Sequence, residues 1–209
     1  MKKPFLFLAL VTLLLQAVKV EAQVGFHAGY APQTLSVSGQ TVMGDAMPST
    51  HFQGFFGGIH FDYPILDNLT LIPALQIRLN TANSKSQDCN IEDWQFIADL
   101  PLQVSYCFPL GDDLGMGIFA GPMLSYGISY TQKTTDLETF EVITSIDRYN
   151  TDFQVSSLRR FEVNVDGGLF LKYKDFMLYS GYRMGLNDLD AVDSMTTKAR
   201  GFFVGIGMD

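Results

Sequence analysis

The stretch Ala199-Arg200-Gly201-Phe202-Phe203-Val204-Gly205-Ile206-Gly207-Met208-Asp209 decides the fold class of this chain. Large apolar residues stand at 202, 204, 206 and 208, and glycine stands at 201, 205 and 207. Alternation with a period of two predicts a β-strand with one apolar face and one face of small residues. Taken with the export signal described next, this strand is expected to close a β-barrel that crosses a membrane.

The other end of the chain has the pattern of a secretory signal peptide. Lys2 and Lys3 give a positive start, residues 5–15 are almost uninterruptedly apolar, and small residues stand at Val20 and Ala22. This pattern predicts a signal peptide at 1–22 and a mature barrel domain at 23–209. The apolar run is shorter than the roughly 20 residues that a membrane helix needs. No later run of that length is free of charge, glycine and proline.

Seven further segments alternate with a period of two and are expected to be strands. They cover residues 24–35, 52–65, 70–80, 94–108, 115–130, 161–173 and 176–187. Short turns and longer polar connections join them in alternation, and the longest connections cover 36–50, 81–93 and 131–160. Short and long connections alternate in this way in bacterial outer-membrane barrels. The expected fold is all-β: an eight-stranded antiparallel transmembrane β-barrel with short periplasmic turns and long external loops.

Several motifs of the mature chain resemble those of a known group of barrels. They are Ala98-Asp99-Leu100-Pro101-Leu102-Gln103-Val104-Ser105-Tyr106, Ala120-Gly121-Pro122, Gly167-Gly168-Leu169 and Tyr182-Arg183-Met184-Gly185-Leu186. In these the chain is similar to the small outer-membrane β-barrels of Bacteroidota, which include the PorT-like proteins. The resemblance implies an outer-membrane location, with outer-membrane lipid and the barrel assembly machinery as partners. Its motifs are architectural and include no catalytic signature.

The face opposite the apolar one collects charged residues of both signs. They are Asp62, Arg78, Asp99, Glu162, Asp166, Lys172 and Arg183. The interior of an eight-stranded barrel is just wide enough for its own side chains. Because an unpaired buried charge is costly, we expect these groups to form an ion-pair network that plugs the lumen. The alternative is a narrow water-filled pore for small-solute transport.

The three histidines raise the question of catalysis or metal binding. Activation of a nucleophile needs serine and histidine within about 3 Å and a third group that orients them. His27 and His60 instead fall on the predicted lumen face. His27, His60 and Asp62 would suit zinc if neighbouring strands placed them side by side, but structural buried histidine is the favoured interpretation. We therefore expect no catalytic residue, no metal and no cofactor, and the protein is not expected to be an enzyme.

The connection at residues 131–160 is the predicted binding element. It carries apolar residues among charged ones: Phe140, Val142, Ile143, Ile146 and Tyr149. Long loops on rigid scaffolds commonly carry function, and a solvated spacer is the plain alternative. The formal net charge of −8 weighs against nucleic acid as a partner. The expected protein is a monomeric barrel with a structural role, or one whose loops bind a surface or periplasmic protein. A soluble periplasmic barrel with an apolar interior is a further alternative.

Overall fold

The structure is a computed structural model that describes residues 23–39, 49–85, 89–139, 141–149, 158–190 and 195–209. The predicted signal peptide and Phe140 lie outside the described residues. The described chain is all-β. Its strands are β1 (Gln23–Tyr30), β2 (Gln33–Gly39), β3 (Thr50–Leu66), β4 (Leu69–Lys85), β5 (Cys89–Pro109), β6 (Leu114–Asp136), β7 (Val142–Asp147), β8 (Phe161–Tyr173), β9 (Phe176–Gly185) and β10 (Met195–Met208). Within the described ranges, no helix has the length and hydropathy required to span a membrane.

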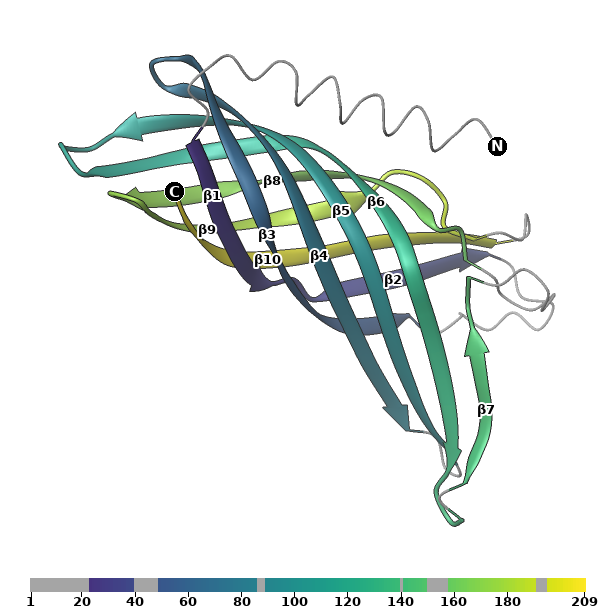
Figure 1. The fold of residues 1–209 in the computed structure, drawn as a ribbon. Coiled ribbons are helices and arrows are strands. Elements are labelled where there is room, and N and C mark those ends of the chain that lie inside the picture. Colours follow the sequence, from purple (N-terminus) through teal and green to yellow (C-terminus); the bar gives the residue numbers. More distant parts are fainter. Residues whose placement is uncertain (1–22, 40–48, 86–88, 140, 150–157, 191–194) are drawn as a thin grey trace.

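The strands form a closed antiparallel ring with eight positions, as predicted (Figure 1). The order around the ring is β1, β3, β4, β5, β6, β8, β9 and β10, and β10 pairs with β1. At the closure, Phe26 lies opposite Met208 and Tyr30 lies opposite Val204. The alternating stretch at 199–209 is therefore the strand that closes the barrel.

Two sequence-based boundaries were wrong. The first predicted strand is divided into β1 and β2, which share one position in the ring between β10 and β3. The break contains Pro32, which has no N–H for the ladder. The second error is that much of the predicted loops at 81–93 and 131–160 is strand: β5 has 21 residues, β6 has 23, and β7 pairs with β6. Pairing between strands satisfies the backbone N–H and C=O groups of these polar segments as well as water does.

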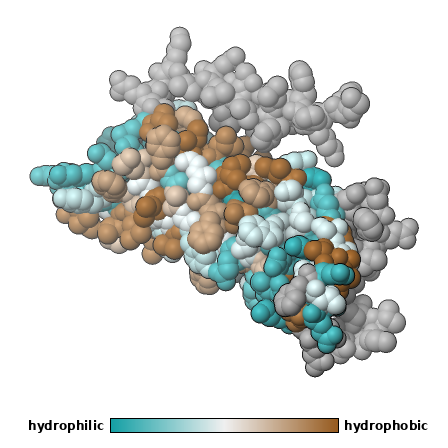
Figure 2. All heavy atoms as spheres, turned by 60° about the horizontal axis from the view of Figure 1, so that its bottom comes forward, coloured by the Kyte–Doolittle hydropathy of each residue, from teal (hydrophilic) through white to brown (hydrophobic). Residues whose placement is uncertain are grey.

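The apolar residues of the alternating strands face outward. Leu169 is 63% exposed and Phe202 is 69% exposed, although both lie in the middle part of their strands. In Figure 2 hydrophobic residues gather over the barrel and hydrophilic residues gather toward its ends. This orientation is the reverse of that expected for a soluble periplasmic barrel with an apolar interior, so that alternative does not describe this fold.

Five of the large rings that face inward are each paired with a glycine of the adjacent strand. Phe170 lies opposite Gly117, and a Cβ at Gly117 would come within 2.4 Å of that ring. The same arrangement joins Phe56 to Gly29, Phe119 to Gly168, Tyr179 to Gly205 and Phe203 to Gly181. The glycines on the inward face thus leave the space that the rings occupy. These five rings form an aromatic layer that fills this part of the lumen.

Candidate functional site

The lumen has two different ends. The turn end is the one at which the short turns Asp67-Asn68, Leu110–Asp113 and Lys174-Asp175 lie, and the loop end is the opposite one. Gln23 and Asp209 both lie at the turn end, since Gln23 pairs beside Asp62 and the Asp209 N–H donates to the Asp175 carbonyl. The polar side chains of the lumen form one group in the centre and a second group at the turn end.

The central group is a network of buried ion pairs. Arg78 holds Asp99 with two hydrogen bonds, Nε to Oδ2 at 3.0 Å and Nη2 to Oδ1 at 3.1 Å. Arg183 holds Asp166 in the same way, with both distances at 2.9 Å. Glu162 lies 3.9 Å from Arg78 Nη2. All five side chains are buried, and Arg78 has no exposed surface. Bidentate pairs of this kind fix the orientation of both side chains, because the planar guanidinium of arginine matches the two carboxylate oxygens.

Uncharged side chains continue this network toward the loop end. Arg78 donates to Gln33, and Asn80 Nδ2 donates to the side-chain oxygens of Gln33 and Gln95, each at 3.0 Å. Gln95 Nε2 then donates to the Tyr149 hydroxyl at 2.8 Å. Tyr149 is buried, and burial raises the pKa of its hydroxyl to about 12. The hydroxyl accepts the last of these hydrogen bonds and ends the network on this side.

The predicted binding loop is divided by the structure. Tyr149 lies inside the barrel and packs in a cluster with Phe52 and Tyr130, so it belongs to the lumen. Val142 and Ile143 are exposed on β7, and Ile146 is half-buried there. Of the described residues that were predicted for this loop, those on β7 lie at the surface and Tyr149 does not.

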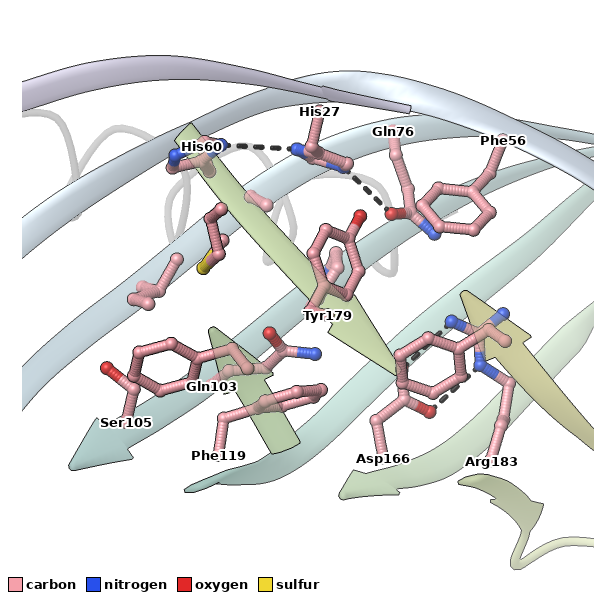
Figure 3. A pocket seen from close by; sticks show the side chains of 16 residues that line it. His27, Phe56, His60, Gln76, Gln103, Ser105, Phe119, Asp166, Tyr179 and Arg183 are labelled. Carbon is pink, nitrogen blue, oxygen red and sulfur yellow. Dashed lines mark hydrogen bonds and ion pairs between the residues drawn. The ribbon is translucent and has the colours of Figure 1, made fainter. Parts of the chain in front are cut away.

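The second polar group lies at the turn end. His60 Nε2 is 2.9 Å from Asp209 Oδ1 and 3.9 Å from Asp62 Oδ1. Lys172 donates to the other oxygen of Asp209. His60 Nδ1 lies 3.3 Å from His27 Nδ1. The series of hydrogen bonds continues from His27 through Gln76 to Asp99 of the central network. Figure 3 shows the part formed by the two histidines and Gln76.

The seven charges predicted as one network are therefore found in two groups. Five of them meet in the centre: Arg78, Asp99, Glu162, Asp166 and Arg183. Asp62 and Lys172 lie with His60 and Asp209 at the turn end. Sequence reasoning missed Asp209 and the amides at 33, 80 and 95. The amides stand on the predicted inward parity of their strands, which was the available signal.

Two small cavities lie on either side of the central network. The larger, of about 50 Å³, is lined by the aromatic layer, the two histidines and the Asp166–Arg183 pair (Figure 3). The smaller, of about 10 Å³, is lined by Gln33, Gln95, Tyr149 and Glu162. One water needs roughly 10–15 Å³ by such a measure. The cavities thus have room for a few waters, with ion pairs between them.

No model of a protein family matches the chain, and no curated protein matches it. Solved structures do show similarity in fold. Neisserial surface protein A is 12% identical with a TM-score of 0.45, covering 90% of this chain and 97% of that one. Ail, the attachment invasion locus protein of Yersinia pestis, is 11% identical with a TM-score of 0.47 in its complex with a heparin analogue, covering 90% and 99%. The outer membrane enzyme PagL is 10% identical with a TM-score of 0.44, covering 90% and 99%. At these identities the similarity concerns the fold alone.

Proposed function

We propose that this protein is an exported outer-membrane β-barrel with a closed lumen, and that it binds a surface partner through the sheet that extends past its loop end. The observation that carries this proposal is the contrast between wall and lumen. The wall exposes apolar side chains around the barrel, while five buried charges meet in the interior, where the contacts Arg78–Glu162 and Arg183–Asp99 join strands that are not neighbours. A lipid environment accepts such a wall, and buried ion pairs in an interior that is just wide enough for its own side chains leave no path for ions.

The extension is formed by the ends of β4, β5 and β6 together with β7, and it projects past the other strands (Figure 1). A strand that crosses an outer membrane needs only about 9–11 residues, and β6 has 23. In the described residues β7 pairs with β6 alone, so one edge of the strand is open, and Val142 and Ile143 are exposed on it. An open edge with apolar side chains suits the addition of a partner strand.

Cysteine labelling of whole cells tests the topology. On a background in which Cys89 and Cys107 are serine, Val142→Cys should react with a membrane-impermeant maleimide on intact cells. Asp67→Cys, in a short turn, should react only after the outer membrane is permeabilised. Labelling of Asp67→Cys on intact cells would contradict the orientation, and recovery of the protein outside the outer-membrane fraction would contradict the location.

Planar bilayer recording tests the closed lumen. The protein purified in detergent is expected to give no steady conductance, because Arg78 reaches Glu162 and Arg183 reaches Asp99 across the interior. Steady, ion-selective single-channel steps would support small-solute transport and contradict the binding role. Migration that shifts on heating in detergent is the control that the protein tested is a folded barrel.

A further inference from the structure

We propose that the turn end of the lumen contains a site for a divalent first-row transition metal ion such as Zn²⁺. Its ligands are His60 Nε2, Asp62 Oδ1 and Asp209 Oδ1. The three side chains offer atoms that all lie within 4.8 Å of one another. Imidazole with carboxylates is a donor set that suits these ions.

The distances fit a shared ion. His60 Nε2 is 2.9 Å from the Asp209 oxygen and 3.9 Å from the Asp62 oxygen. Ligand bonds to tetrahedral zinc are about 2.0–2.2 Å, so that neighbouring ligand atoms stand roughly 3.3–3.6 Å apart. The two observed distances bracket this spacing. His60 is 3% exposed, and the Asp209 side chain is 5% exposed.

The direction of the hydrogen bonds places a proton on His60 Nδ1 and leaves Nε2 to face the two carboxylates. Asp99 is a carboxylate held by two guanidiniums and can only accept, so Gln76 donates to it with Nε2, at 2.9 Å. The Gln76 oxygen then faces His27 Nε2 at 3.0 Å, and this nitrogen must donate. A neutral imidazole has one N–H, so His27 Nδ1 accepts and His60 Nδ1 donates to it.

His60 Nε2 consequently faces two carboxylate oxygens, and a cation shared by the three atoms satisfies all of them. A proton on Nε2 would serve only the Asp209 oxygen at 2.9 Å. It would leave Asp62 Oδ1 as it stands, buried and without a hydrogen-bond partner. A metal ion engages all three atoms. The bond from His60 Nδ1 to His27 is then the outer contact that metal-bound histidines make with their second nitrogen.

The surroundings hold the ligands in place and favour positive charge. A Cβ at Gly25, the partner of His60 across the sheet, would lie 2.3 Å from Nε2, so the glycine leaves room for the ring. Lys172 donates to Asp209 Oδ2 and leaves Oδ1 turned to His60. The ammonium of Lys172 holds only Oδ2 of Asp209, so Asp209 Oδ1 and Asp62 present negative charge that a bound cation offsets.

Titration with Co²⁺ tests the site, because tetrahedral Co²⁺ with nitrogen and oxygen ligands has characteristic visible absorption. The purified full barrel in detergent should bind one equivalent, and Zn²⁺ should displace it. His60→Gln and Asp209→Asn should abolish the absorption. His51→Gln, which removes an exposed histidine bonded to Thr34 at 3.0 Å, should leave it unchanged.

Two further variants separate a metal site from a structural group. His27→Leu should weaken Co²⁺ binding by about 10–100-fold, as loss of an outer contact does. Asp62→Asn should weaken it as well, although a merely shared proton between His60 and Asp209 would not involve Asp62. Heat-shifted migration confirms that each variant is folded. A folded wild-type protein that binds no stoichiometric Co²⁺, or equal binding by wild type, His60→Gln and Asp62→Asn, would overturn the proposal.

Discussion

The two polar groups of the lumen use similar residues and reach different states. In the centre each arginine meets a carboxylate with two parallel hydrogen bonds, and all five charges are buried. At the turn end the cation is Lys172, which is 35% exposed and holds a single carboxylate oxygen. Asp62 Oδ1 is buried there without a hydrogen-bond partner, 3.9 Å from His60 Nε2. The difference teaches that lumen charges can close a barrel where two arginines each hold a carboxylate with two hydrogen bonds, or leave carboxylate oxygens turned to a further cation where a single lysine holds them.

The largest effect is expected from breaking the central group. Arg183→Ala should leave Asp166 buried without its partner and destabilise the barrel by about 3–5 kcal/mol. Lys172→Ala is the matched change at the turn end and should cost at most about 1 kcal/mol, because a partly exposed ion pair is screened by water. Urea unfolding in lipid vesicles, followed by the fluorescence of the single tryptophan, Trp94, measures both. Equal losses in the two variants would remove the distinction between the groups.

The outer wall of the barrel can be tested within β8. Leu169→Arg places a charge on the exposed apolar face and should cost about 2–4 kcal/mol near the middle of a bilayer. The measurement is the yield of folded protein in vesicles, read by heat-shifted migration. Unimpaired folding of Leu169→Arg into vesicles would mean that this face does not meet lipid.

The aromatic layer between the two groups gives a smaller effect and a close control. At Gly168 a new Cβ would come within 2.2 Å of the Ser180 carbonyl oxygen and 2.7 Å of the Phe119 ring. Gly168→Ala should therefore destabilise the barrel by about 1–3 kcal/mol, as overpacking does. At the neighbouring Gly167 the nearest atom would be 3.7 Å away, so Gly167→Ala should be neutral or slightly stabilising. The same urea titration compares the two, and equal costs would contradict the tight ring–glycine pairing.

The sequence predicted the faces of the strands better than the contacts across the lumen. Successive side chains of a strand alternate between faces, so Arg78 and Asp99 could be assigned to the interior without knowing the register. Contacts depend on register and on closure of the ring. His60 meets Asp209, 149 positions away, only because β10 closes against β1. The paired extension was missed because its polar residues have the composition of a loop, and the ladder, not an apolar core, supports it.

The smallest expected effect concerns the tip of the extension, where β6 turns toward β7. Asp136 Oδ1 accepts the backbone N–H of Glu138 at 2.8 Å and of Thr139 at 2.9 Å. These bonds, the one from Thr139 first, hold the pKa of the Asp136 carboxyl below its usual range. A folded-state pKa below the unfolded value means that the carboxylate stabilises the turn at pH values above the unfolded pKa, near 3.9. This stabilisation is lost as the pH falls through the folded value.

Hydrogen exchange at the Glu138 and Thr139 amides should therefore show protection that is constant between about pH 5 and 7 and that falls at lower pH, after correction for intrinsic exchange. Asp136→Ala should remove that protection at every pH and leave barrel unfolding unchanged, because the turn lies outside the ring. Protection of the two amides that survives in Asp136→Ala would show that the β6–β7 pairing, and not this carboxylate, orders the turn.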